Sequence, residues 1–99
     1  MTDVIVRGTA LRWEPDDIRG WIEVVVPDGA GRSHHIIEKV PVLTRADITA
    51  ASAFPREIWL SATYKRMDGD DVIVHFPRGV ETTEGLDELT VAAADVRWL

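Results

Sequence analysis

The chain has 99 residues, with 17 acidic against 11 basic side chains, a formal net charge of −6 and no cysteine. A chain of this length makes one small domain, and its 45% of apolar residues argues against general disorder. The lack of cysteine excludes disulfides, cysteine-ligated zinc, iron–sulfur clusters and thiol nucleophiles.

The first predicted strand begins at Val4 and ends at Trp13, and its apolar side changes along the way. Val4 and Val6 share one phase of the alternation, whereas Leu11 and Trp13 share the other. Because Gly8 lies between the two pairs, we expect a β-bulge there, of the kind that lets a sheet curl.

Two more strands are predicted in the first half of the chain. A turn at residues 15–17 precedes a strand over residues 20–26. Every second residue of this strand, Ile22, Val24 and Val26, is apolar, so one of its faces is apolar. The Pro-Asp-Gly-Ala-Gly run at residues 27–31 marks the next turn. A third strand is predicted over residues 34–43, where Pro41 lacks an N–H and indicates either a sheet edge or the end of the hydrogen-bonded ladder.

One short helix is predicted over residues 44–53. Thr44 is a suitable N-cap, the alanines that follow favour a helix, and Pro55 ends it. Such a helix would cover one end of the sheet.

A hairpin is predicted from strands over residues 57–65 and 72–76, joined around residues 68–70. The apolar faces of the two strands agree only when Tyr64 lies opposite Val74. That pairing favours an odd loop of three or five residues over a two-residue loop.

The last segment, residues 86–98, is ambiguous between helix and strand. Three consecutive alanines favour a helix, whereas the valines and the tryptophan favour strands. We expect a strand through residues 89–91, a helical turn over residues 92–95 and a final short strand.

These elements predict a mainly β domain over residues 1–99. We expect a small antiparallel barrel or a strongly bent sheet of five to six strands with one short helix. SH3-like and OB-like topologies both remain open.

Few side chains are placed for catalysis or metal binding. His34 and His35 are adjacent on a predicted strand and so face opposite sides, which prevents them from chelating one metal. None of the serines lies in a G-x-S-x-G turn, and the paired acids lie in predicted turns. We expect no metal site, no cofactor and no catalytic residue; a carboxylate acting with His75 is the enzymatic alternative.

The four tryptophans are the most informative side chains. We expect Trp13 and Trp98 to fill the core. Trp21 and Trp59 alternate with core-facing neighbours and should face away from it. Because aromatic residues are enriched at interfaces, we expect Trp21 and Trp59 to form a partner surface or a dimer seam.

Much of the negative charge lies near the end of the chain. Residues 79–99 hold five acids and one base, a net charge of −4. Such a surface repels phosphates and favours a basic partner. The candidate contacts are Glu81, Glu84, Asp87 and Glu88.

The leading functional hypothesis is a non-catalytic binding module that acts through protein–protein contact or self-association. By analogy it could neutralise a basic partner, as small bacterial inhibitor or immunity proteins do. The first residues lack the features of a signal peptide, and no apolar run approaches the roughly 20 residues of a membrane span. We therefore expect a cytoplasmic protein without a membrane segment.

Two motifs give an alternative hypothesis. Residues 8–13 (G-T-A-L-R-W) with residues 20–22 (G-W-I) loosely resemble the first strands of cold-shock domains, and residues 72–76 (V-I-V-H-F) are similar to their V-F-V-H-F strand. The resemblance implies an OB-type barrel that binds single-stranded nucleic acid or a nucleotide by stacking. The stacking residues that it implies are Trp13, Trp21, His75 and Phe76. The sequence departs from the family at Glu14, where an aromatic residue is usual, and in its negative charge.

Overall fold

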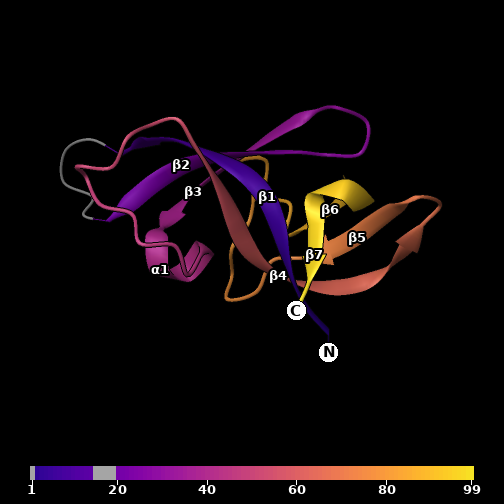
Figure 1. The fold of residues 1–99 in the computed structure, drawn as a ribbon. Helices are drawn as coiled ribbons and strands as arrows, with labels where there is room; N and C mark the ends of the chain where they lie inside the picture. Colours follow the sequence, from indigo (N-terminus) through magenta and orange to yellow (C-terminus); the bar gives the residue numbers. More distant parts are fainter. Residues whose placement is uncertain (1, 15–19) are drawn as a thin grey trace.

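The computed structural model describes residues 2–14 and 20–99. The turn predicted at residues 15–17 therefore lies outside the described residues. The described chain is mostly β structure, with one short helix and one 3-10 turn (Figure 1). The elements are β1 (Thr2–Trp13), β2 (Trp21–Pro27), β3 (Ser33–Lys39), α1 (Val40–Leu43), β4 (Arg56–Asp68), β5 (Asp71–His75), β6 (Glu88–Ala92), η1 (Ala93–Asp95) and β7 (Val96–Trp98).

The strands form one antiparallel sheet in the order β3-β2-β1-β4-β5-β6. β1 pairs with β4 along one edge from Thr2 to Ala10. Its other edge pairs with β7 around Ile5 and with β2 from Thr9 onward. Because β7 follows β6 through η1, the sheet curls until its last strand returns to its first, and the two termini lie close together (Figure 1). The prediction of a strongly bent antiparallel sheet with one short helix is confirmed.

Alternate residues of the strands supply the core. Each fully buried Val, Leu, Ile or Phe contributes roughly 1.5–3 kcal/mol of burial free energy. The largest fully buried side chains are Phe76, Ile22, Ile36, Leu43, Ile58, Leu60, Val4, Val6, Val24, Val26, Val72 and Val74. The predicted inward face of β2 is part of this set.

The bulge in β1 lies at a different place from the predicted one. The register with β2 shifts between Ala10 and Arg12, so Leu11 is the extra residue. This shift explains the change of apolar side within β1. Gly8 has another role: a Cβ there would lie 3.1 Å from the carbonyl oxygen of Val25. The bulge at Gly8 was therefore a wrong prediction, because that glycine serves a close approach of two strands.

The helix predicted over residues 44–53 is wrong. The helix α1 precedes that segment and carries Pro41 in its first turn, where the missing N–H is tolerated. β3 accordingly ends where α1 begins, earlier than predicted. Thr44 follows α1 in extended conformation, and its hydroxyl donates a hydrogen bond to the Trp59 carbonyl at 2.7 Å. Its oxygen is thus part of a loop that is fastened to β4.

The hairpin of β4 and β5 places Tyr64 opposite Val74, as the apolar faces predicted. The predicted odd loop is wrong, because a two-residue turn at residues 69–70 joins the strands. An extra residue in β4, Lys65, shifts the register instead. A bulge therefore supplies the odd residue that the loop was expected to supply.

The end of the chain matches its prediction. A strand, a 3-10 turn and a short strand follow one another as β6, η1 and β7. Within the described residues, none of the helices has the length and apolar character needed to cross a membrane.

Candidate functional site

A groove of about 590 Å³ runs along β4. One wall consists of β4 and the start of β1, which contributes Asp3 and Ile5. The opposite wall consists of residues 44–46, after α1, and residues 77–78, after β5. The side chain of Arg78 links the segment after β5 to α1, because its guanidinium donates a hydrogen bond to the Val42 carbonyl.

The groove follows an edge of β4 that lacks a strand partner among the described residues. β1 pairs with β4 from Arg56 to Tyr64, whereas β5 pairs with the other edge of β4 only from Thr63 onward. The residues of β4 that precede Thr63 therefore have no β5 residue beside them. The edge that remains open is the one that lines the groove.

The backbone groups on this open edge can be assigned from the ladder. In an antiparallel strand the N–H and the C=O of one residue point to the same edge of the strand, and the next residue points to the opposite edge. Every second residue therefore presents its backbone groups to the same edge. The Trp59 carbonyl accepts the Thr44 hydroxyl on the groove side. Glu57 and Ser61 share the phase of Trp59, so their N–H and C=O groups also point into the groove. Leu60, in the opposite phase, bonds to β1.

Three strand edges in the described chain are each covered by one loop contact. An unpaired edge is a place where an extended segment of another chain can pair. The edge of β4 differs from the other two because it lines the groove. The covering bonds run from the Thr83 amide to the His35 carbonyl on β3 (2.8 Å), from the Gly29 amide to the Thr90 carbonyl on β6 (2.9 Å) and from the Thr44 hydroxyl to the Trp59 carbonyl on β4 (2.7 Å).

Trp59 lies on the wall of this groove and faces away from the main core, as predicted. It is half-buried, whereas its neighbours Ile58 and Leu60 are fully buried. The guanidinium carbon of Arg97, on β7, lies 4.0 Å from the centre of the Trp59 ring. This cation–π contact fixes the ring and covers part of it.

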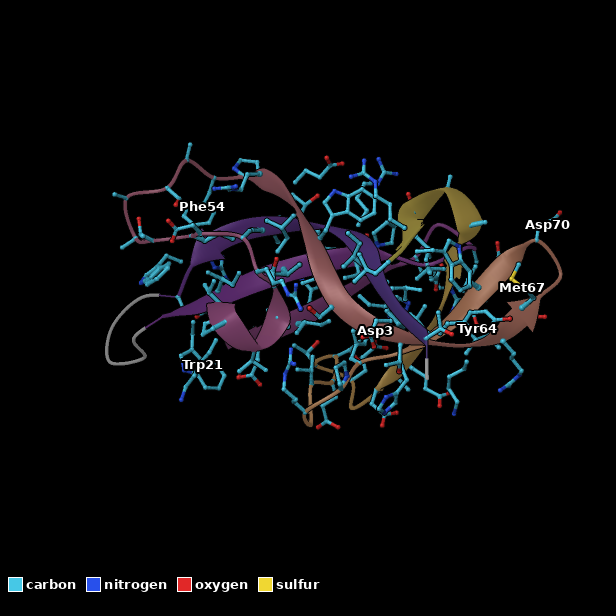
Figure 2. All side chains as sticks on the ribbon, turned by 60° about the horizontal axis from the view of Figure 1, so that its bottom comes forward. Asp3, Trp21, Phe54, Tyr64, Met67 and Asp70 are labelled. Atoms are coloured by element: carbon cyan, nitrogen blue, oxygen red, sulfur yellow. The ribbon has the colours of Figure 1, made fainter. Side chains whose placement is uncertain are left out.

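Trp21 lies far from Trp59, and the structure does not join them in one surface. Trp59 pairs with Arg7 on β1, whereas Ile22, next to Trp21, pairs with Trp13. Arg7 and Trp13 lie six positions apart on β1, a distance of roughly 20 Å. Figure 2 shows Trp21 at one end of the molecule and Asp3, from the groove, away from it.

The two tryptophans expected in the core behave differently. Trp13 is partly buried and packs against the core. Trp98 is 53% exposed, so its predicted core position is wrong. Its ring instead contacts Tyr64, with the two ring centres 4.8 Å apart. β7 has only three residues at this edge, which leaves the outer face of Trp98 uncovered.

The predicted acidic surface is largely paired with bases of other strands. Glu84 lies 3.1 Å from the His34 ring, Asp87 lies 3.3 Å from the His75 ring, and Glu88 contacts Lys65. Glu81 is exposed. Most of these carboxylates therefore already have an intramolecular contact that a basic partner would have to replace.

His34 and His35 point to opposite faces, as predicted. His34 is buried, and its Nε2 lies 2.8 Å from Asp28 Oδ2 while its Nδ1 faces Glu84. The hydrogen bond with His34 holds the pKa of Asp28 below its ordinary value, and the backbone amides of Arg32 and Ala30 act in the same direction. In the described parts of the chain, no group of three His, Cys, Asp or Glu side chains could hold a metal ion.

His75 and Asp87 form the carboxylate–histidine pair of the enzymatic alternative, with 3.3 Å between Nε2 and Oδ2. A depression beside His75 is lined by Thr63 and two neighbouring residues of β4. The Thr63 hydroxyl donates to the backbone carbonyl of His75 and not to its ring. The pair is therefore not joined to the Thr63 hydroxyl as a histidine base is joined to its nucleophile.

The stacking residues implied by the cold-shock resemblance do not share an exposed face. Phe76 is 1% exposed and belongs to the core, so its ring is closed to a base. His75 lies on the other face of the strand, beside Asp87. Trp13 and Trp21 lie at the far end of the β1–β2 ladder.

Sequence reasoning missed most of the groove. Trp59 was among the predicted site residues, but Ser61 and Thr44 were not. The arginines that line the groove, Arg45, Arg56 and Arg78, were not predicted either. The local sequence of β4 gives an exposed phase but does not say which edge lacks a partner. Comparison with known proteins finds no matching family model, no similar curated protein and no similar solved structure.

Proposed function

We propose that this protein is a non-catalytic binding module that takes up an extended segment of a partner protein along the open edge of β4. The observation that carries the proposal is the coincidence of the groove with the groove-facing backbone groups of Glu57, Trp59 and Ser61. Because the Trp59 carbonyl already accepts the Thr44 hydroxyl, an added strand would bond mainly to the N–H and C=O of Ser61, in the way that β1 bonds to the other edge of β4.

Backbone pairing alone would give a weak complex. Each backbone hydrogen bond contributes about 0.5–1.5 kcal/mol net, and the open edge offers only a few groups. Apolar side chains of the lining supply the rest: Trp59 and Ile5 are half-buried, and Leu99 is 74% exposed. A tryptophan beside such an edge is typical of an interface residue that contributes much of the binding energy.

The groove supports this contact better than the acidic segment does. A basic partner bound there would compete with His34, His75 and Lys65 for the carboxylates. Self-association through two β4 edges is the other protein contact that the open edge permits. A cytoplasmic location stays a prediction from the sequence.

The test selects peptides of about eight residues from a random displayed library on the folded protein. The recovered peptides are synthesised and titrated by calorimetry against the wild type, Ser61→Pro and Ile37→Pro. Proline removes the backbone N–H. At both positions the N–H of the wild type points away from the neighbouring strand, so its loss leaves the existing sheet pairing intact. Ile37 is the matched control because it shares the phase of His35, whose carbonyl faces the outer edge of β3.

We expect Ser61→Pro to weaken binding at least about tenfold and Ile37→Pro to leave it within about twofold. Near-ultraviolet circular dichroism shows whether each variant is folded. Peptides that bind all three proteins equally, or a selection that recovers no binding peptide, would overturn the proposal. Sedimentation of the free protein tests the dimer, which would itself be lost in Ser61→Pro.

A further inference from the structure

Three arginines line the groove: Arg45, Arg56 and Arg78. In the part of the chain that the structure describes, none of them lies within ion-pair distance of a carboxylate. Arg45 and Arg78 are exposed, and Arg56 is partly exposed. The guanidinium of Arg78 is held beside the groove by its bond to the Val42 carbonyl.

The acids of the same groove do not balance these arginines. Asp3 and Glu57 also line it, and the carboxylate of Glu57 lies 3.7 Å from Arg7, outside the lining. Counted over side chains, the three arginines and two acids of the lining leave one excess positive charge, on a chain whose net charge is −6. Charge of opposite sign to the rest of the surface steers and orients a ligand of the complementary sign.

We infer that the segment bound along β4 is acidic: an extended stretch of another protein with carboxylate side chains at alternate positions. This inference rests on the proposed function and specifies the chemistry of its ligand. Successive side chains of a strand face opposite sides, so alternate carboxylates share one face. Guanidinium groups bind carboxylates through paired, charge-assisted hydrogen bonds, which suits the exposed Arg45 and Arg78.

A single-stranded nucleic acid is the other polyanion that arginines attract, but the open edge favours a peptide. The groove-facing groups of Ser61 include both a donor and an acceptor, which match a peptide backbone. A phosphate backbone offers acceptors only. Binding of a peptide should therefore depend on the backbone groups of the open β4 edge, whereas binding of an oligonucleotide should not.

The experiment compares three synthetic peptides of about eight residues, which alternate threonine with glutamate, glutamine or lysine. Each is titrated by calorimetry against the wild type, Arg45→Glu, Arg66→Glu and Ser61→Pro. Arg66→Glu is the matched control, because Arg66 is exposed on β4 but does not line the groove. A thymidine oligonucleotide of equal length is the fourth ligand.

We expect the glutamate peptide to bind the wild type at least about tenfold more tightly than the glutamine peptide, and the lysine peptide to bind most weakly. Arg45→Glu should remove most of that preference, and Arg66→Glu should preserve it. Ser61→Pro should weaken the glutamate and glutamine peptides by the same factor, because it acts on the backbone contact.

Equal binding of the glutamate and glutamine peptides would overturn the acidic ligand. The proposed function would still stand if Ser61→Pro weakened both peptides. The acidic ligand would also be overturned if Arg66→Glu lost as much of the preference for the glutamate peptide as Arg45→Glu, since the charge effect would then not belong to the groove. Tighter binding of the oligonucleotide, undiminished by Ser61→Pro, would overturn both the acidic ligand and the binding module.

Discussion

The Thr44 hydroxyl donates a hydrogen bond to the Trp59 carbonyl across 2.7 Å and so ties the loop after α1 to the middle of the open edge of β4. The same oxygen accepts the Ala46 amide at 3.1 Å. One side chain therefore shapes the groove at the point where its two walls meet.

Replacing Thr44 with valine should lower the free energy of unfolding by about 1–2 kcal/mol. Valine keeps the shape of threonine but removes the donor to Trp59 and the acceptor for Ala46 inside a buried site. Urea denaturation measures the change. Thr83→Val is the control, because Thr83 is exposed and its fold contact uses the backbone amide. Equal losses in the two variants would show that the Thr44 side chain has no special role.

Gly8→Ala should destabilise the protein by about 1–3 kcal/mol. The new Cβ would lie 3.1 Å from the Val25 carbonyl and 3.3 Å from a methyl of Leu60, and a backbone carbonyl in a ladder cannot easily move. The midpoint of thermal or urea unfolding measures the effect. An unchanged midpoint would mean that β1 and β2 can separate without loss, contrary to the close packing described.

Asp28 should contribute to the loss of stability in acid. Because its pKa is lower in the folded protein than in the unfolded chain, its contribution is present above about pH 4. That contribution is lost as the pH falls from there through the folded pKa. Asp28→Asn should therefore flatten the dependence of unfolding free energy on pH below about 4.

Urea unfolding of Asp28→Asn between about pH 5 and pH 2.5 gives this dependence. Asp47→Asn serves as the control, since Asp47 is exposed. An acid limb as steep as that of the wild type would contradict the role given to the contact between Asp28 and His34.

Trp98→Ala should cost only about 0.5–1.5 kcal/mol. The ring is half-exposed, so its loss removes the contact with Tyr64 without opening a core cavity. Unfolding by urea distinguishes this value from the 3–5 kcal/mol that is typical of a core tryptophan. A loss in the higher range would restore the core position that the sequence predicted for Trp98.

The alternation of apolar and polar residues predicted the strands well, because burial with a period of two residues depends only on residues that are close in the sequence. The buried phase of β2 and the opposite directions of His34 and His35 follow from it. The helix at residues 44–53 failed because alanine propensity is a weak preference. Thr44 and Ser52 bond to nearby amides in turns, which competes with helix formation.

The groove could not be predicted in the same way. Its open edge depends on where β5 leaves β4, after the pair of Thr63 and His75, and this is a relationship between distant segments. Its arginines come from a loop, a strand end and a second loop, so no local motif joins Arg45, Arg56 and Arg78. The net negative charge of the chain predicted a basic partner, whereas the arginines of the groove favour an acidic one.

Hydrogen exchange at the Ser61 amide tests the binding of a strand along β4 most directly. In the free protein this N–H faces the groove and should exchange fast, whereas the Leu60 amide, bonded to β1, should be protected. Saturation with the glutamate–threonine peptide should slow exchange at Ser61 at least about tenfold. Binding of that peptide with unchanged exchange at Ser61 would contradict the account, because the segment would then lie elsewhere.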